Sequence, residues 1–160
     1  MEKPHKKLDA WKLAIELAVR TYRQSESLPR EEKYGLIGQM RRAATSVPCN
    51  IAEGAARQTR KEFANFLHIA QGSLSELDTL FELALRLEYF QPTVIDDLDP
   101  LMERLDKTIS GLIRRQRKFE EENEKGKGGV GRRYVFSPPP SRLPLPASPL
   151  SPIASRPEVV

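Results

Sequence analysis

The chain has 160 residues, of which 26 are Lys or Arg and 22 are Asp or Glu, so its formal net charge is +4 at pH 7. Residues 1–123 carry 20 residues of each sign, so the excess positive charge belongs to residues 124–160 and does not argue for nucleic-acid binding by the preceding region. No apolar run approaches the roughly 20 residues of a membrane span, and the single cysteine excludes an internal disulfide. Because there is also no signal-type apolar segment, we expect a cytoplasmic protein without membrane contact.

Apolar residues recur at helical spacing in the first quarter of the chain. The first helix is expected from about Leu8 to Ser27, where the following Leu28-Pro29 pair disfavours further helix. Its predicted core-facing seam is Trp11, Ile15, Ala18 and Tyr22.

The second helix is expected over residues 30–56. Its predicted seam consists of Ile37, Met40, Ala44, Val47, Ile51 and Ala55. Because the seam keeps its phase through Pro48, we expect proline to bend this helix rather than end it. Cys49, on the same helix, is expected to be a small buried thiol.

Two further helices follow. Thr59 and Glu62 have the spacing of a capping box and predict the start of a helix that ends near Phe90. The fourth helix is expected from Pro92 or Thr93 to about Glu121. Short connections make consecutive helices antiparallel, so the predicted fold is all-α: an up-down-up-down four-helix bundle over residues 1–123.

Composition changes sharply after Asn123. Residues 124–160 contain 8 of the 13 prolines, a glycine-rich basic stretch and a Pro/Ser-rich end. Such a segment has too little apolar surface to offset the entropy of ordering, so residues 124–160 are predicted to form a disordered tail. Its proline spacing also permits a polyproline II ligand, although a passive tail is the favoured interpretation.

The residues needed for catalysis or metal binding are missing. The chain has two histidines, His5 and His68, and no pair of Glu-x-x-His motifs for a di-iron centre. It also has no Cys/His cluster for zinc and no Gly-rich loop for phosphate. We therefore expect a non-enzymatic protein with no cofactor and no bound metal.

A second stripe on the second helix lies about 140° from its apolar seam. The stripe is polar and is flanked by small residues, which favour the close approach of another helix. It is interpreted either as a solvated face or as a subunit interface that pairs with a similar face of the third helix. The interface candidates are Ala43, Ser46, Asn50, Ala52, Glu53, Asn65, His68 and Gly72.

Basic residues gather near the connection between the second and third helices. The phosphate-binding candidates are Arg41, Arg42, Arg57, Arg60 and Lys61. Solvated charge and pairing between subunits are the alternatives. A second basic group, Arg114 to Lys118, is explained by the dipole at a helix C-terminus. No aromatic residues are interleaved in the manner of single-strand binders, so contact with the RNA backbone is favoured over reading of bases.

Residues 5–120 resemble a bacterial four-helix-bundle family associated with intervening sequences of 23S rRNA genes. The resemblance rests on Leu8 to Lys12, on Glu32 to Leu36 and above all on Gln39 to Gly54. It implies a ring of subunits, namely a homopentamer. It also implies a relation to accessory variability proteins of diversity-generating retroelements, which bind nucleic acid and a reverse transcriptase. This chain departs from those basic proteins because its first 123 residues are charge-neutral.

Three functional hypotheses follow from the residues and the resemblance. The first is a ring-forming protein that associates with 23S rRNA or another structured RNA through the local basic residues. The second is an oligomeric scaffold that binds a protein partner. The third is an accessory protein that binds a reverse transcriptase and nucleic acid.

Overall fold

The computed structural model describes residues 3–125, with side chains described through Glu122. Its elements are η1 (Pro4–Lys7), α1 (Asp9–Gln24), η2 (Ser25–Ser27), η3 (Arg30–Tyr34), α2 (Leu36–Ala55), α3 (Arg60–Arg86) and α4 (Pro92–Lys125). The last helix continues two residues beyond the predicted boundary at Asn123. The predictions for the tail otherwise concern residues that lie outside this description.

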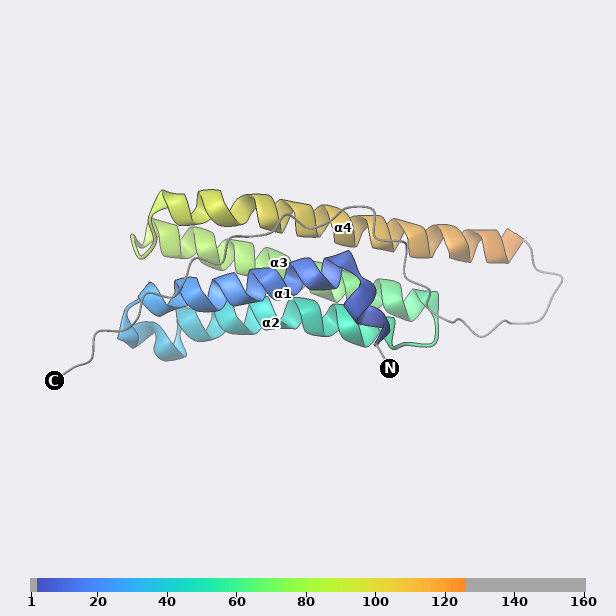
Figure 1. Cartoon of the computed structure of the whole chain (residues 1–160), viewed down its shortest axis with the longest axis horizontal. Helices are drawn as coiled ribbons and strands as arrows, with labels where there is room; N and C mark the ends of the chain where they lie inside the picture. The colour runs from blue at the N-terminus through green and yellow to red at the C-terminus, as the bar shows by residue number, and fades with distance from the viewer. Residues whose placement is uncertain (1–2, 126–160) are drawn as a thin grey trace.

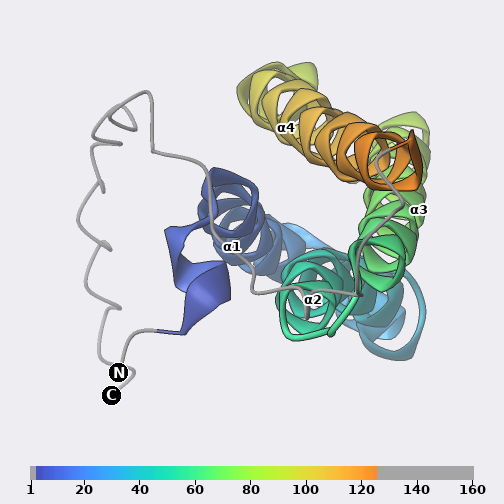
Figure 2. The same cartoon turned by 90° about the vertical axis from the view of Figure 1, so that its right-hand side faces the viewer.

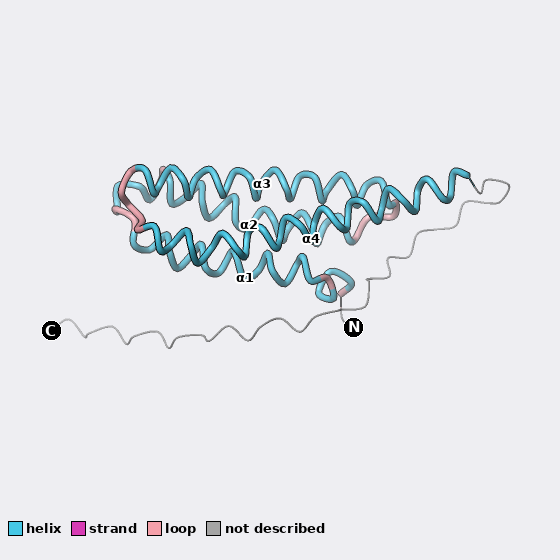
Figure 3. The backbone as a smooth tube through the Cα atoms, turned by 90° about the horizontal axis from the view of Figure 1, so that it is seen from above, coloured by secondary structure: helices cyan, strands magenta, loops and turns pink. Residues whose placement is uncertain are grey.

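The four long helices run alternately up and down and lie side by side (Figure 1). Viewed from its end, the bundle places α1 beside α2, α2 beside α3, and α3 beside α4 (Figure 2). Short turns join the helices, and residues 3–125 contain no strand (Figure 3). The predicted all-α bundle is therefore confirmed. No helix in the described part is long and apolar enough to cross a membrane.

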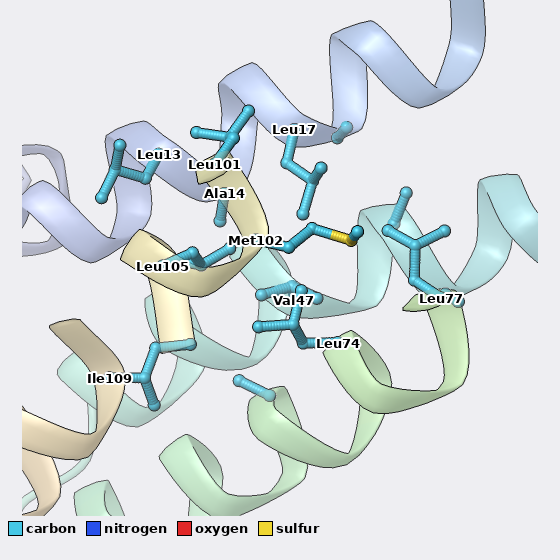
Figure 4. Close-up of a cluster of buried hydrophobic side chains, with 14 of the residues drawn as sticks. Leu13, Ala14, Leu17, Val47, Leu74, Leu77, Leu101, Met102, Leu105 and Ile109 are labelled. Carbon is cyan, nitrogen blue, oxygen red and sulfur yellow. The ribbon is translucent and has the colours of Figure 1, made fainter. Parts of the chain in front are cut away.

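The core lies between the four helices and contains mainly leucine and alanine. Leu13 and Leu17 from α1 face Met102 and Leu105 of α4, while Val47 of α2 approaches from below (Figure 4). These side chains are almost completely buried. Burial of each large apolar side chain contributes about 1.5–3 kcal/mol, which is the main source of the bundle's stability.

The predicted seam of α1 was wrong at Ile15 and Tyr22, whereas Ala18 is buried and Trp11 packs against the core as predicted. Ile15 and Tyr22 are 38% and 42% exposed, whereas Ala14 and Thr21 are fully buried. The Thr21 hydroxyl donates to the Leu17 carbonyl over 2.9 Å, and this hydrogen bond makes its burial possible. Small residues on the buried face let α1 pack closely, which a pattern weighted toward large side chains does not reveal.

The second predicted helix is divided at Gly35, which separates η3 from α2. Gly35 has a non-helical ψ of −116°, and the Glu32 side chain accepts a hydrogen bond from the Leu36 amide over 2.9 Å. Glu32 thereby accepts a hydrogen bond from one of the backbone N–H groups in the first turn of α2 that have no partner within the helix. Downstream, α2 continues through the buried Pro48, as predicted. Cys49 is exposed, so the prediction of a buried thiol was wrong.

The capping box at the start of α3 is present as predicted. The Thr59 hydroxyl accepts from the Glu62 amide over 3.2 Å, and the Glu62 carboxylate accepts from the Thr59 amide over 3.1 Å. The helix ends at Arg86, before the predicted limit near Phe90, and Glu88 adopts a positive φ of 59° in the turn to α4.

Candidate nucleic-acid interface

Two basic groups that are far apart in sequence meet at one end of the bundle. Because α3 and α4 are antiparallel, the start of α3 lies beside the C-terminal half of α4 (Figure 1). We call this region the basic end, and it consists of Arg57, Arg60, Lys61, Arg114, Arg115, Arg117 and Lys118. The fold thus joins three of the predicted phosphate-binding residues to a group that the sequence analysis attributed to a helix dipole.

Arg60 connects the two helices of the basic end. Its guanidinium lies 4.1 Å from the ring centroid of Phe119, and it donates to the Gln116 side chain over 3.3 Å. Arg115 approaches the same ring at 5.6 Å. Stacking on an aromatic face reduces the freedom of a guanidinium while leaving its edge available to hydrogen-bond. Phe119 therefore orients two arginines at this end of the molecule.

Arg57 and Arg117 are also oriented by neighbours. Arg57 pairs with the Glu53 carboxylate one turn earlier, and its guanidinium lies 4.7 Å from the centroid of Phe66. Arg117 contacts the His68 ring nitrogen Nε2 at 3.2 Å. These contacts fix the two guanidinium groups at the α2–α3 and α3–α4 boundaries, respectively.

Two aromatic rings, Phe66 and Phe119, lie among these cations. Phe66 and Phe119 are half-buried, and both are approached by guanidinium groups rather than open to solvent. Lys61 and Arg114 are exposed and have no acidic partner among the side chains that the structure describes. This arrangement suits contact with phosphate oxygens better than stacking on bases.

The two remaining phosphate-binding candidates lie elsewhere. Arg41 precedes Ala55, the last residue of α2, by 14 residues, or about 21 Å along the helix. Its guanidinium donates to the Ser25 hydroxyl over 2.8 Å and lies 4.8 Å from the centroid of Tyr22. Arg42 approaches Glu76 at 3.8 Å. Arg41 therefore ties α2 to the end of α1, and the predicted five-residue patch is not contiguous.

The polar stripe of α2 has partners on α3 of the same chain. The Ser46 hydroxyl lies 2.8 Å from the Ser73 hydroxyl, and the Asn50 side-chain amide donates to the Ser46 carbonyl over 2.9 Å. Ala43 is 1% exposed and belongs to the core, so it has no surface to offer a second subunit. Within the monomer, part of this stripe meets α3, and its role at a subunit interface stays a prediction. Ala52 remains half-buried and Glu53 exposed.

The outer face of α3 remains exposed. Asn65, His68 and Gly72 lie on it, together with Ile69, which is 51% exposed. These residues are available for contact with another subunit, and their role at an oligomer interface stays a prediction.

The described residues contain no group of three His, Cys, Asp or Glu side chains that could hold a metal ion. His5 packs against Trp11 with ring centroids 5.2 Å apart. Burial lowers the pKa of His5, and the nearby charges of Lys3 and Lys6 lower it further.

Comparison with known proteins connects this fold to a family. The family model of the 23S rRNA-intervening sequence protein matches residues 6–111, about two thirds of the chain. The chain belongs to this family. The match covers most of the bundle, including the motif around Pro48, but it ends before Arg114 and the rest of the basic group on α4. None of the curated proteins matches the chain.

A crystal structure of a protein of unknown function from the S23 ribosomal protein family of Bacteroides thetaiotaomicron VPI-5482 is similar to this 23S rRNA-intervening sequence protein family member. The two chains share 28% identity with a TM-score of 0.61, and the alignment covers 65% of this chain and 97% of that chain.

Sequence reasoning did not place the α4 basic group and Phe119 beside the start of α3. The predicted topology could have indicated this proximity, because an antiparallel four-helix bundle places the N-terminus of its third helix and the C-terminus of its fourth helix at the same end. What the sequence alone did not show was the stacking of Arg60 on Phe119, which depends on the register between α3 and α4.

Proposed function

We propose that this protein binds structured RNA through the basic end and catalyses no reaction. The observation that carries the proposal is the convergence of Arg60 from α3 and Arg115 from α4 on the ring of Phe119. Orienting a guanidinium before binding reduces the entropy lost when it contacts a phosphate. The family's description makes 23S rRNA carrying an intervening sequence the first ligand to examine.

The proposal includes assembly into a ring, namely a homopentamer. A ring repeats the basic end once per subunit, so several weak phosphate contacts act together on one RNA. Light scattering should then give a mass near 91 kDa, five times the 18.2 kDa of one chain. A mass of one chain at micromolar concentration would refute the ring while leaving the basic end to be tested separately.

The decisive experiment measures RNA affinity against salt concentration. A fluorescently labelled 23S rRNA hairpin is titrated with the full chain and with the variant Lys61→Gln/Arg114→Gln/Arg117→Gln. Each phosphate contact contributes about 0.7–0.9 to the slope of log affinity against log salt. Losing three contacts should reduce the magnitude of the slope by about 2–3.

A matched control removes the same charge far from the basic end. Arg23, Arg30 and Lys33 are exposed near the α1–α2 connection, and their replacement by glutamine should leave the slope unchanged. Equal losses in both variants would show that only overall charge matters. Binding by the wild-type chain that is absent or insensitive to salt would overturn the proposal.

A protein-binding scaffold is the second candidate function. It is favoured by the apolar stripe of Ile15, Val19 and Tyr22, which are spaced four and three residues apart on α1 and are each 38–44% exposed. Such a stripe is typical of helix surfaces that receive a partner. Affinity capture that recovers one stoichiometric protein and no RNA would support this function. The reverse transcriptase partner stays a prediction from the resemblance.

A further inference from the structure

Two apolar stripes are exposed on helices that are not neighbours in the bundle. The α1 stripe, each of whose side chains is 38–44% exposed, consists of Ile15, Val19 and Tyr22. The α3 stripe, each of whose side chains is 45–51% exposed, consists of Ile69, Leu83 and Leu87. At about 100° per residue, each stripe lies within about 60° of arc on its helix. Apolar surface concentrated in this way is typical of a face that another molecule covers.

The two stripes lie on opposite sides of α2, which separates α1 from α3 in the end view (Figure 2). A contact between the α1 stripe of one copy and the α3 stripe of the next would join two different surfaces. Such a contact leaves one stripe free on each of the two copies, so it repeats from copy to copy and closes into a ring if the rotation permits.

Contacts along α2 give the relative levels of α1 and α3. Arg41 of α2 donates to the hydroxyl of Ser25, the residue after the end of α1, over 2.8 Å. Ile15 precedes Ser25 by ten residues, and α2 runs antiparallel to α1. The level of Ile15 is therefore reached about ten residues after Arg41, at Ile51 of α2.

The same reasoning connects α2 to α3. The Ser46 hydroxyl of α2 lies 2.8 Å from the Ser73 hydroxyl of α3. Ile51 follows Ser46 by five residues, so its level on the antiparallel α3 is five residues before Ser73, next to Ile69. Ile15 and Ile69 consequently lie within about one helical turn of the same level. Both helices also run in the same direction, so a rotation about an axis along the bundle brings the two residues together without a shift.

In this parallel register the shapes of the two faces match. Val19 follows Ile15 by four residues, and Gly72 follows Ile69 by three. Gly72 is exposed, and a Cβ there would meet nothing within 4 Å, so the surface of α3 is open at the level of Val19. A valine side chain can therefore approach the backbone of α3 closely at this point.

The charges beside the stripes also match in this register. Arg23 follows Val19 by four residues, and Glu76 follows Gly72 by four, so the two charges come to the same level. Arg23 is exposed and has no acidic partner among the side chains that the structure describes. Glu76 is exposed and approaches Arg42 at 3.8 Å. An ion pair between Arg23 of one copy and Glu76 of the next would fix the register.

We propose that the α1 stripe of one copy packs in parallel against the α3 stripe of the next copy. This contact rests on the ring proposed above and specifies the two faces that form it. Because rotated copies keep the direction of their helices, a ring built in this way also places the basic end of every subunit on one face of the assembly.

The experiment mixes two variants, each of which keeps one stripe intact. Val19→Asp charges the α1 stripe and Ile69→Asp charges the α3 stripe, and since both positions are exposed each variant should melt at the wild-type temperature. Light scattering at roughly 100 µM detects contacts in the micromolar range. Each variant alone should have the mass of one chain, 18.2 kDa, and an equimolar mixture should give a pair of about 36 kDa. The pair cannot grow because both of its outer stripes carry aspartate.

Two control variants accompany the mixture. Thr93→Asp adds the same charge at an exposed position on α4 and should keep the wild-type mass. The double variant Val19→Asp/Ile69→Asp has no intact stripe and should stay at the mass of one chain in a mixture with either single variant.

Assemblies of wild-type mass in either single variant would overturn the proposal and leave the ring, because other faces would then form it. A pair formed by one variant alone, or an equimolar mixture that stays at the mass of one chain, would also overturn it. A wild-type chain with the mass of one chain would overturn the contact and the ring together. RNA affinity against salt tests the basic end in a separate measurement, so that part of the proposed function stands or fails independently.

Discussion

Replacing Gly54 by alanine should destabilise the bundle, because α2 and α3 approach each other closely at this residue. A Cβ at Gly54 would lie 2.7 Å from Phe66 Cβ and 2.8 Å from Phe63 Cδ2. Ordinary carbon contacts lie at about 3.5–4.0 Å, so the helices would have to separate by nearly an ångström or Phe63, which is fully buried, would have to turn. Overpacking of this kind costs about 1–3 kcal/mol, against a gain of up to about 1 kcal/mol from replacing glycine in a helix. The net loss should be about 1–2 kcal/mol.

Gly72→Ala is the matched substitution with the opposite expected sign. Gly72 is exposed on α3, and a Cβ there would meet nothing within 4 Å. Alanine should therefore stabilise the helix by about 0.5–1 kcal/mol. Urea denaturation followed by circular dichroism measures both values, provided that the m-value is unchanged. A neutral or stabilising effect of Gly54→Ala would refute the close approach of α2 and α3. A lower mass of Gly72→Ala in light scattering would instead place Gly72 at a subunit interface.

Three further predictions concern α2 and its connection to α3. A double-mutant cycle of Ser46→Ala and Ser73→Ala should give a coupling free energy of about 0.5–1.5 kcal/mol, and additive effects would contradict the 2.8 Å hydrogen bond. Thr59→Ala should lower the free energy of unfolding by about 1 kcal/mol while Thr59→Ser retains it, as urea denaturation will show. Cys49 should react with an aromatic disulfide reagent in the native protein, whereas reaction only after unfolding would contradict its exposure.

The bundle itself could be predicted because several local signals agree. The capping box at Thr59 is a local backbone feature and does not depend on distant residues. The helical seam of α2 continues through Pro48 without a change of phase. The one backbone hydrogen bond that proline removes costs less free energy than exposing Val47 and Ile51 would. Signals of this kind establish which segments are helical and which neighbours are antiparallel.

The rotation of α1 could not be predicted in the same way. Its two stripes compete: one contains Trp11, Ile15 and Tyr22, and the other is rich in alanine and leucine. Large side chains favour the first stripe when each residue is weighted by its own hydrophobicity. Packing favours the stripe rich in alanine and leucine. Alanine lets α1 lie close to the neighbouring helices, and this close approach brings many side chains into van der Waals contact.

In the candidate site, too, local sequence features could be predicted, whereas contacts between distant residues could not. Each basic group was visible in the sequence, but Arg60 and Phe119 are 59 residues apart and meet only through the register of α3 against α4. On α2 the sequence suggested contact with a second subunit, and it did not show that Ser73 of the same chain meets Ser46. In the proposed ring, the exposed face of α3 with Ile69 and Gly72 would offer a neighbouring subunit surface that the monomer leaves uncovered. That face adjoins His68 and therefore Arg117, so association there would border the basic end and place the cations of adjacent subunits along one rim.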